Sequence, residues 1–111
     1  MRGLYLAIPL LAAAIAAPSA LAEDAAPTAG SSESLFLEKC GLCHLEGGFG
    51  TRVLQRRVPA GQALLQDRNS LPAAYTSAVV RHGIGSMPQI REAELTDAQL
   101  AAIALYLETG A

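Results

Sequence analysis

The chain is short, slightly acidic and rich in small apolar side chains. It has 111 residues, of which 51% are hydrophobic, and its formal net charge is −2 at pH 7. This length allows one small domain, and a negative net charge argues against nucleic acid as a partner.

The first 22 residues have the organisation of a secretory signal peptide. Arg2 supplies the positive charge, residues 4–17 form an apolar run, and residues 20–22 (Ala-Leu-Ala) have the small-x-small pattern of a cleavage site. A retained membrane anchor is the alternative, but Pro9 and Pro18 interrupt a run shorter than the roughly 20 apolar residues that cross a bilayer. The sequence therefore predicts export to the periplasm, cleavage at this site, and no membrane anchor afterwards.

Residues 23–31 are rich in Ala, Pro, Gly and Ser, which predicts a flexible leader. The folded domain is then expected over residues 32–111. In a domain of this size a hydrophobic core alone gives marginal stability. A buried apolar cofactor would supplement such a core.

A helix is expected to begin near Ser32 or Glu33 and to carry Cys40-Gly41-Leu42-Cys43-His44. C-x-x-C-H is the spacing that attaches a c-type haem covalently. On a helix both sulfurs and the imidazole emerge on one face, so one turn can hold the porphyrin edge while His44 reaches the iron. The pattern predicts one covalent haem c, attached through Cys40 and Cys43, with His44 as an iron ligand.

The two cysteines have three other interpretations. A redox dithiol is typical of a strand-helix-strand context, and no strand pattern precedes Cys40. A structural zinc site needs four ligands, and His82 is the only Cys or His that follows the motif. A plain disulfide leaves His44 unexplained.

The middle of the domain has weaker signals. Gly47 to Gly50 should end the first helix because glycines favour irregular backbone. Residues 51–70 have poor periodicity, with a short helix expected around residues 61–66. A second main helix is expected from Leu71, capped by Ser70, with Pro72 in its first turn and Gly83 as its end.

The last helix has the strongest local signals. Thr96-Asp97-Ala98-Gln99 forms a capping box, Leu95 can pack on Leu100 as a hydrophobic staple, and Gly110 ends the helix. No strand pattern or internal repeat appears. The sequence therefore predicts an all-α fold of three main helices, with loops wrapped around a covalent haem.

Met87 is the candidate for the second iron ligand. It is the only methionine after residue 22 and lies in Gly85-Ser86-Met87-Pro88, where the proline favours extended backbone. The alternatives are that Met87 fills a gap in the core, or that His82 is the ligand. A histidine at a helix end is more often packed or hydrogen-bonded.

The order of these segments resembles the class I c-type cytochromes over residues 32–109. The resemblance implies a monohaem fold with His44 and Met87 as axial ligands, and crossing first and last helices with Phe36 and Tyr106 near the contact. One departure is Thr51, where the family often has a proline whose carbonyl orients the haem histidine. We expect another carbonyl to take that role.

A narrower resemblance rests on Leu71-Pro72-Ala73-Ala74-Tyr75, residues 79–83 (Val-Val-Arg-His-Gly) and Met87-Pro88. These segments resemble the cytochrome subunit of 4-cresol dehydrogenase-type flavocytochromes. That resemblance implies a flavin-containing dehydrogenase or hydroxylase as redox partner, acting on alkylphenols.

The expected function is periplasmic electron transfer by a carrier without a substrate of its own. Phe49 and Ile84 are expected to form an apolar docking patch, ringed by Arg52, Arg56, Arg57 and Arg81. Arg52 or Arg56 is expected to pair with a haem propionate. The alternatives are a five-coordinate haem that binds a gas or peroxide, and a thiol oxidoreductase.

Overall fold

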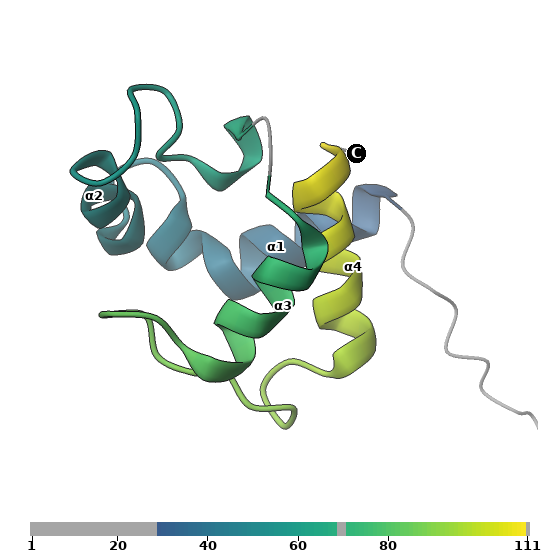
Figure 1. Ribbon diagram of the computed structural model, residues 1–111. Coiled ribbons are helices and arrows are strands. Elements are labelled where there is room, and N and C mark those ends of the chain that lie inside the picture. Colours follow the sequence, from purple (N-terminus) through teal and green to yellow (C-terminus); the bar gives the residue numbers. More distant parts are fainter. Residues whose placement is uncertain (1–28, 69–70, 111) are drawn as a thin grey trace, which may run out of the picture.

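The computed structural model describes residues 29–68 and 71–110. In these ranges the chain forms four α-helices and one 3-10 turn (Figure 1): α1 (Ala29–His44), α2 (Phe49–Gln55), η1 (Leu65–Asp67), α3 (Ala73–His82) and α4 (Asp97–Thr109). The β-type pairing found there is an isolated bridge between Ile84 and Met87. The prediction of an all-α fold is confirmed. The signal sequence and most of the predicted leader lie outside the described residues.

The core lies where α4 packs against both α1 and α3. Phe36 of α1 is fully buried, and its ring centroid lies 5.9 Å from that of Tyr106 in α4, with the ring planes tilted by 44°. This tilted geometry is one that aromatic pairs prefer. The contact between the first and last helices, which the family resemblance implies, is therefore present. The remaining buried members of the cluster are Leu71, Val80, Leu95, Leu100, Ile103 and Leu107.

Both ends of α4 follow the predicted caps. The Thr96 hydroxyl accepts a hydrogen bond from the Gln99 backbone N–H at 3.2 Å, and the Gln99 side-chain oxygen accepts one from the Thr96 N–H at 3.0 Å. Gly110 ends the helix at φ 70°, in the left-handed region. Leu95 and Leu100, the predicted staple, are both buried in the core cluster.

α3 begins later than expected. Pro72 occupies the N-cap position, and the helix starts at Ala73, whose N–H donates to a Glu108 carboxylate oxygen at 3.1 Å. This contact ties the start of α3 to the end of α4 and suits the positive end of the helix dipole. Ser70, the predicted cap, lies outside the described residues. Gly83 ends α3 as predicted, at φ 73°.

Three other boundaries differ from the prediction. α1 begins at Ala29, inside the segment expected to be a flexible leader. The glycine-rich segment ends α1 as expected, but α2 follows at once from Phe49, and η1 covers Leu65–Asp67 in place of a helix at 61–66. Tertiary packing of α2 against α1 outweighs the low helix propensity of Gly50. Among the described helices, none combines the length and apolarity needed to span a membrane.

Candidate functional site

A cavity of about 280 Å³ lies between the end of α1, α2, α3 and the loop that follows α3. Cys40, Cys43 and His44 line it from α1, and Met87 lines it from the loop. Most of the other lining side chains are apolar. The structure therefore brings the four residues predicted to hold a haem to the wall of one apolar cavity. Further lining residues are Phe36, Phe49, Val53, Leu54, Leu65, Leu71, Val79, Val80, Ile84, Ile103 and Leu107.

The glycines after α1 allow the chain to fold tightly around the end of that helix. A Cβ at Gly48 would lie 2.5 Å from the Cys43 carbonyl oxygen. A Cβ at Gly50 would lie 2.9 Å from the same oxygen and 3.0 Å from Cε1 of the His44 ring. The two distances to the Cys43 oxygen are too short for a side chain. Gly48 and Gly50 thus let the backbone fold closely over the Cys43 carbonyl, and Gly50 also lies close to the His44 ring.

A buried threonine stabilises this turn. Thr51 is 1% exposed, and its hydroxyl donates to the Leu45 carbonyl oxygen at 2.8 Å, an oxygen that also accepts from the Gly48 N–H at 3.0 Å. Thr51 therefore satisfies a carbonyl just past the end of α1. It does not contact the imidazole through a hydrogen bond. No local sequence pattern predicts this role, because the carbonyl that accepts from the Thr51 hydroxyl lies six positions away.

The His44 imidazole is suited to bind a metal as a neutral base. Burial lowers its pKa below the ordinary value, so the ring is uncharged at neutral pH. Its Nδ1 is buried and has no hydrogen-bond partner among the described residues. The expectation that another carbonyl replaces the family's proline carbonyl is therefore not met in this structure. Gly50 lies against the Nδ1 side of the ring, where a Cβ would be 3.2 Å from Nδ1.

Cys40 does not have the character of a redox-active thiol. Burial, and then the charge of the neighbouring Cys43, raise the pKa of Cys40 to about 11. Reactive thiols in dithiol oxidoreductases have a lowered pKa, because the thiolate is the nucleophile. The buried environment of Cys40 instead suits a sulfur in an uncharged thioether bond.

Met87 lies at the end of a tight turn that follows α3. Ile84 and Met87 exchange two backbone hydrogen bonds of 3.0 and 2.9 Å. Gly83 and Gly85 make the turn possible, with φ of 73° and 56°. Met87 is partly buried and packs against the core cluster. His82, the rival ligand, is exposed and is not among the residues that line the cavity.

The sequence matches one protein family along most of its length. The family described as "Cytochrome C oxidase, cbb3-type, subunit III" matches residues 27–107. The chain belongs to this family of c-type cytochromes. Comparison with curated proteins and with solved structures found no match.

Membership in this family makes the chain a haem-based electron-transfer domain of the class I c-type cytochromes, with one covalently bound haem c. The cavity fits such a group in three respects. It is largely apolar, it has two cysteine sulfurs on its wall, and it has a neutral imidazole and a thioether among its lining side chains. The described residues contain no cluster of three His, Cys, Asp or Glu that would suggest another metal.

Two arginines of this cytochrome line the cavity. Neither is one of the two that the sequence predicts as propionate partners. Arg57 and Arg68 line the cavity. Arg52 and Arg56 are exposed and do not line it. The Nε of Arg68 donates to the Gln62 carbonyl oxygen at 3.1 Å, which orients its guanidinium group.

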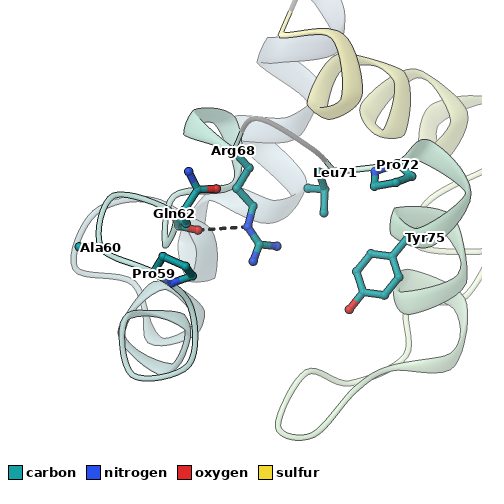
Figure 2. Close-up of a pocket in the computed structure, with 7 residues that line it drawn as sticks. All are labelled: Pro59, Ala60, Gln62, Arg68, Leu71, Pro72 and Tyr75. Atoms are coloured by element: carbon teal, nitrogen blue, oxygen red, sulfur yellow. Dashed lines mark hydrogen bonds between the residues drawn. The ribbon is translucent and has the colours of Figure 1, made fainter.

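A second, open cavity of about 490 Å³ adjoins the first and shares Arg68, Leu71 and Tyr75 with it. Figure 2 shows the Arg68 guanidinium and the Tyr75 hydroxyl directed into the space between the two sides of this cavity. Arg68 forms no ion pair within residues 29–68 and 71–110. An unpaired, oriented guanidinium at the polar end of an apolar cavity is a suitable partner for a carboxylate.

Proposed function

We propose that this chain is a periplasmic electron carrier, or the non-catalytic electron-transfer subunit of an oxidoreductase. The observation that carries the proposal is the convergence of Cys40, Cys43, His44 and Met87 on one cavity. Bound haem c supplies a reversible one-electron Fe(III)/Fe(II) couple. Export is supported by the signal-like residues 1–22, and it agrees with the resembling families, in which haem is attached outside the cytoplasm.

Each of the four residues has a distinct role in the proposal. Cys40 and Cys43 bind the porphyrin edge covalently, so the protein retains it in both oxidation states. His44 supplies a neutral nitrogen ligand. Met87 supplies a soft thioether, which favours Fe(II) and raises the reduction potential.

Two alternative functions have less support. A five-coordinate haem that binds gas or peroxide needs an open iron position, but Met87 lines the cavity and the exposed His82 does not. A thiol oxidoreductase needs an activated cysteine, but burial raises the pKa of Cys40.

The proposed docking surface surrounds the mouth of the cavity. Phe49 and Ile84 line the cavity and yet are 53% and 55% exposed. Arg57 is exposed beside them, and one of its terminal nitrogens approaches Gly85 of the Met87 turn. An apolar centre with cationic neighbours suits an acidic patch on a redox partner.

We propose a flavin-containing oxidoreductase as that partner, on the narrower resemblance to 4-cresol dehydrogenase-type flavocytochromes. The cytochrome should co-purify with a flavoprotein at low salt, and an alkylphenol should reduce its haem. Charge-assisted docking should weaken as salt rises, whereas a permanent apolar subunit contact should persist. A complex without flavin, or iron that stays oxidised after the alkylphenol is added, would refute the flavocytochrome assignment and leave the electron carrier in place.

We propose Arg68, with Tyr75 on the facing side of the open cavity, as the partner of a haem propionate. Replacing Arg68 by Gln should lower the reduction potential by about 30–60 mV, because loss of a nearby positive charge favours Fe(III) and about 59 mV is a tenfold change for one electron. The propionate pKa should also rise, so the pH-dependent part of the potential should move to higher pH. Potentiometric titration across pH measures both changes.

Arg52→Gln and Arg56→Gln are the matched controls, because both side chains are exposed and lie outside the cavity lining. Their potentials should stay within a few millivolts of the native value at moderate salt, where exposed charges are screened. If either control moves the pH-dependent part of the potential and Arg68→Gln does not, the assignment made from the sequence is right and Arg68 is not the partner.

A further inference from the structure

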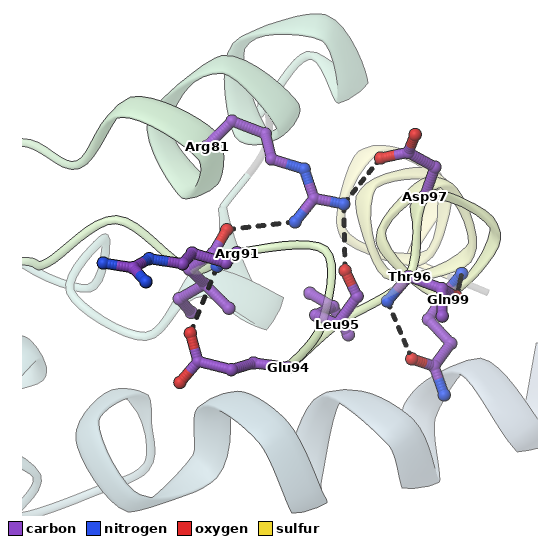
Figure 3. A network of polar contacts seen from close by, with 8 residues as sticks. Arg81, Arg91, Glu94, Leu95, Thr96, Asp97 and Gln99 are labelled. Atoms are coloured by element: carbon purple, nitrogen blue, oxygen red, sulfur yellow. Dashed lines mark hydrogen bonds and ion pairs between the residues drawn. The ribbon is translucent and has the colours of Figure 1, made fainter.

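Arg81 makes three polar contacts that the proposed electron-transfer chemistry does not require. It lies in the last turn of α3, and its side chain is only 23% exposed. Nη1 donates to the Ile90 carbonyl oxygen at 3.0 Å, while Nη2 donates to the Leu95 carbonyl oxygen at 2.9 Å and pairs with Asp97 at 2.6 Å (Figure 3). One guanidinium group thus joins α3 to the backbone carbonyls of Ile90 and Leu95, which lie further along the chain.

Those two carbonyls bracket the segment between the Met87 turn and α4. Ile90 is also held by its N–H, which donates to the Val80 carbonyl oxygen at 2.8 Å. Leu95, at the other end, is 1% exposed and immediately precedes the capping box of α4. The segment after Met87 is therefore fixed to α3 at one end and to the core at the other, with Arg81 at both.

The segment before Met87 is fixed by a different device. A Cβ at Gly83 would lie 2.8 Å from the Met87 carbonyl oxygen, so this turn folds closely back on the end of α3. Met87 consequently lies between a tight glycine turn and the stretch that Arg81 holds. Movement of the Met87 backbone away from the cavity requires one of these two restraints to yield.

We propose that Arg81 is a positioning residue for Met87, which holds the loop of residues 83–95 so that the thioether stays on the iron. The inference rests on the proposed function, in which Met87 is the second ligand. The two backbone contacts carry the effect, because each of these partly buried carbonyls would lose a charged donor without Arg81. The pair with Asp97 contributes little, since Asp97 is 78% exposed.

Imidazole titration of the oxidised holoprotein tests the proposal, because imidazole binds the iron only when Met87 has left it. The apparent affinity for imidazole is proportional to the population of the open loop. In Arg81→Ala the apparent affinity should rise about tenfold, and amide exchange of residues 84–95 should accelerate by a similar factor. The iron-to-methionine charge-transfer band should weaken in the same variant.

Three further variants separate the backbone contacts from charge. Arg91→Ala removes an exposed arginine from the same loop and should leave the imidazole affinity unchanged. Asp97→Asn removes the ion pair but keeps both carbonyl contacts, and should change the affinity less than twofold. Arg81→Lys keeps the charge without the guanidinium fork, and should raise the affinity about threefold. If Arg81→Ala does not fold, Arg81→Lys decides the question alone.

Two results would overturn the inference. One is native imidazole affinity in a folded Arg81→Ala, or in Arg81→Lys where the alanine variant does not fold. The other is an increase in Asp97→Asn as large as that in Arg81→Ala, which would assign the effect to surface charge. Failure of the proposed function looks different, because the unmutated protein would then show no methionine charge-transfer band at all.

Discussion

Replacing Met87 by Ala should abolish the iron-to-methionine charge-transfer band of the oxidised protein and lower its reduction potential. We expect a fall on the order of 0.2 V, a fraction of the roughly 0.8 V range over which axial ligands set haem potentials. The physical reason is the loss of a soft thioether that favours Fe(II). An absorption spectrum and a potentiometric titration of the variant measure both effects.

Ile84→Ala is the matched control for this variant. Ile84 lines the same cavity, lies in the same turn and is 55% exposed, but it has no atom that can bind iron. It should keep the charge-transfer band and change the potential only slightly. If Met87→Ala keeps the band and the potential, the second ligand is another residue and the proposed ligand set is wrong.

Replacing Phe36 by Ala should destabilise the protein by about 3–5 kcal/mol, the usual cost of truncating a fully buried aromatic side chain. Phe36 is 0% exposed, packs on Tyr106 at the contact of α1 with α4, and also lines the cavity. Because a small domain has a total stability of only about 5–15 kcal/mol, the loss should be visible as a large fall in Tm. Thermal unfolding of the haem-loaded variant measures it.

Leu37→Ala is a suitable control, since it is the next residue of α1 and is 41% exposed. It should cost about 1 kcal/mol or less. Equal losses in the two variants would mean that the packing of α1 on α4 is not the main source of stability.

The helices that the sequence predicts well are those with strong local signals. Thr96 and Gln99 define the start of α4 by a capping box that needs no tertiary contact, and Gly83 and Gly110 end their helices by positive φ. α2 could not be predicted in this way. Its first residues include Gly50, and it is stabilised by packing against α1 and by the buried Thr51.

In the candidate site, too, the residues placed by local spacing could be predicted and those placed by tertiary packing could not. Cys40, Cys43 and His44 could be placed together because helical spacing alone brings them to one face, and all three line the cavity. The arginines could not be placed, because the path of residues 56–68 decides which of them reaches the cavity. The sequence predicts Arg81 beside the docking patch, whereas its guanidinium contacts partners that lie 9 to 16 positions further along the chain.

The most direct test of covalent attachment is denaturing electrophoresis of the haem-loaded protein, stained for haem. We expect haem to stay with the polypeptide after denaturation, because thioether bonds to Cys40 and Cys43 survive the loss of the fold. Replacement of both cysteines by Ala should remove the stain. Haem that separates from the unmutated chain on denaturation would contradict the covalent attachment on which the proposed function depends.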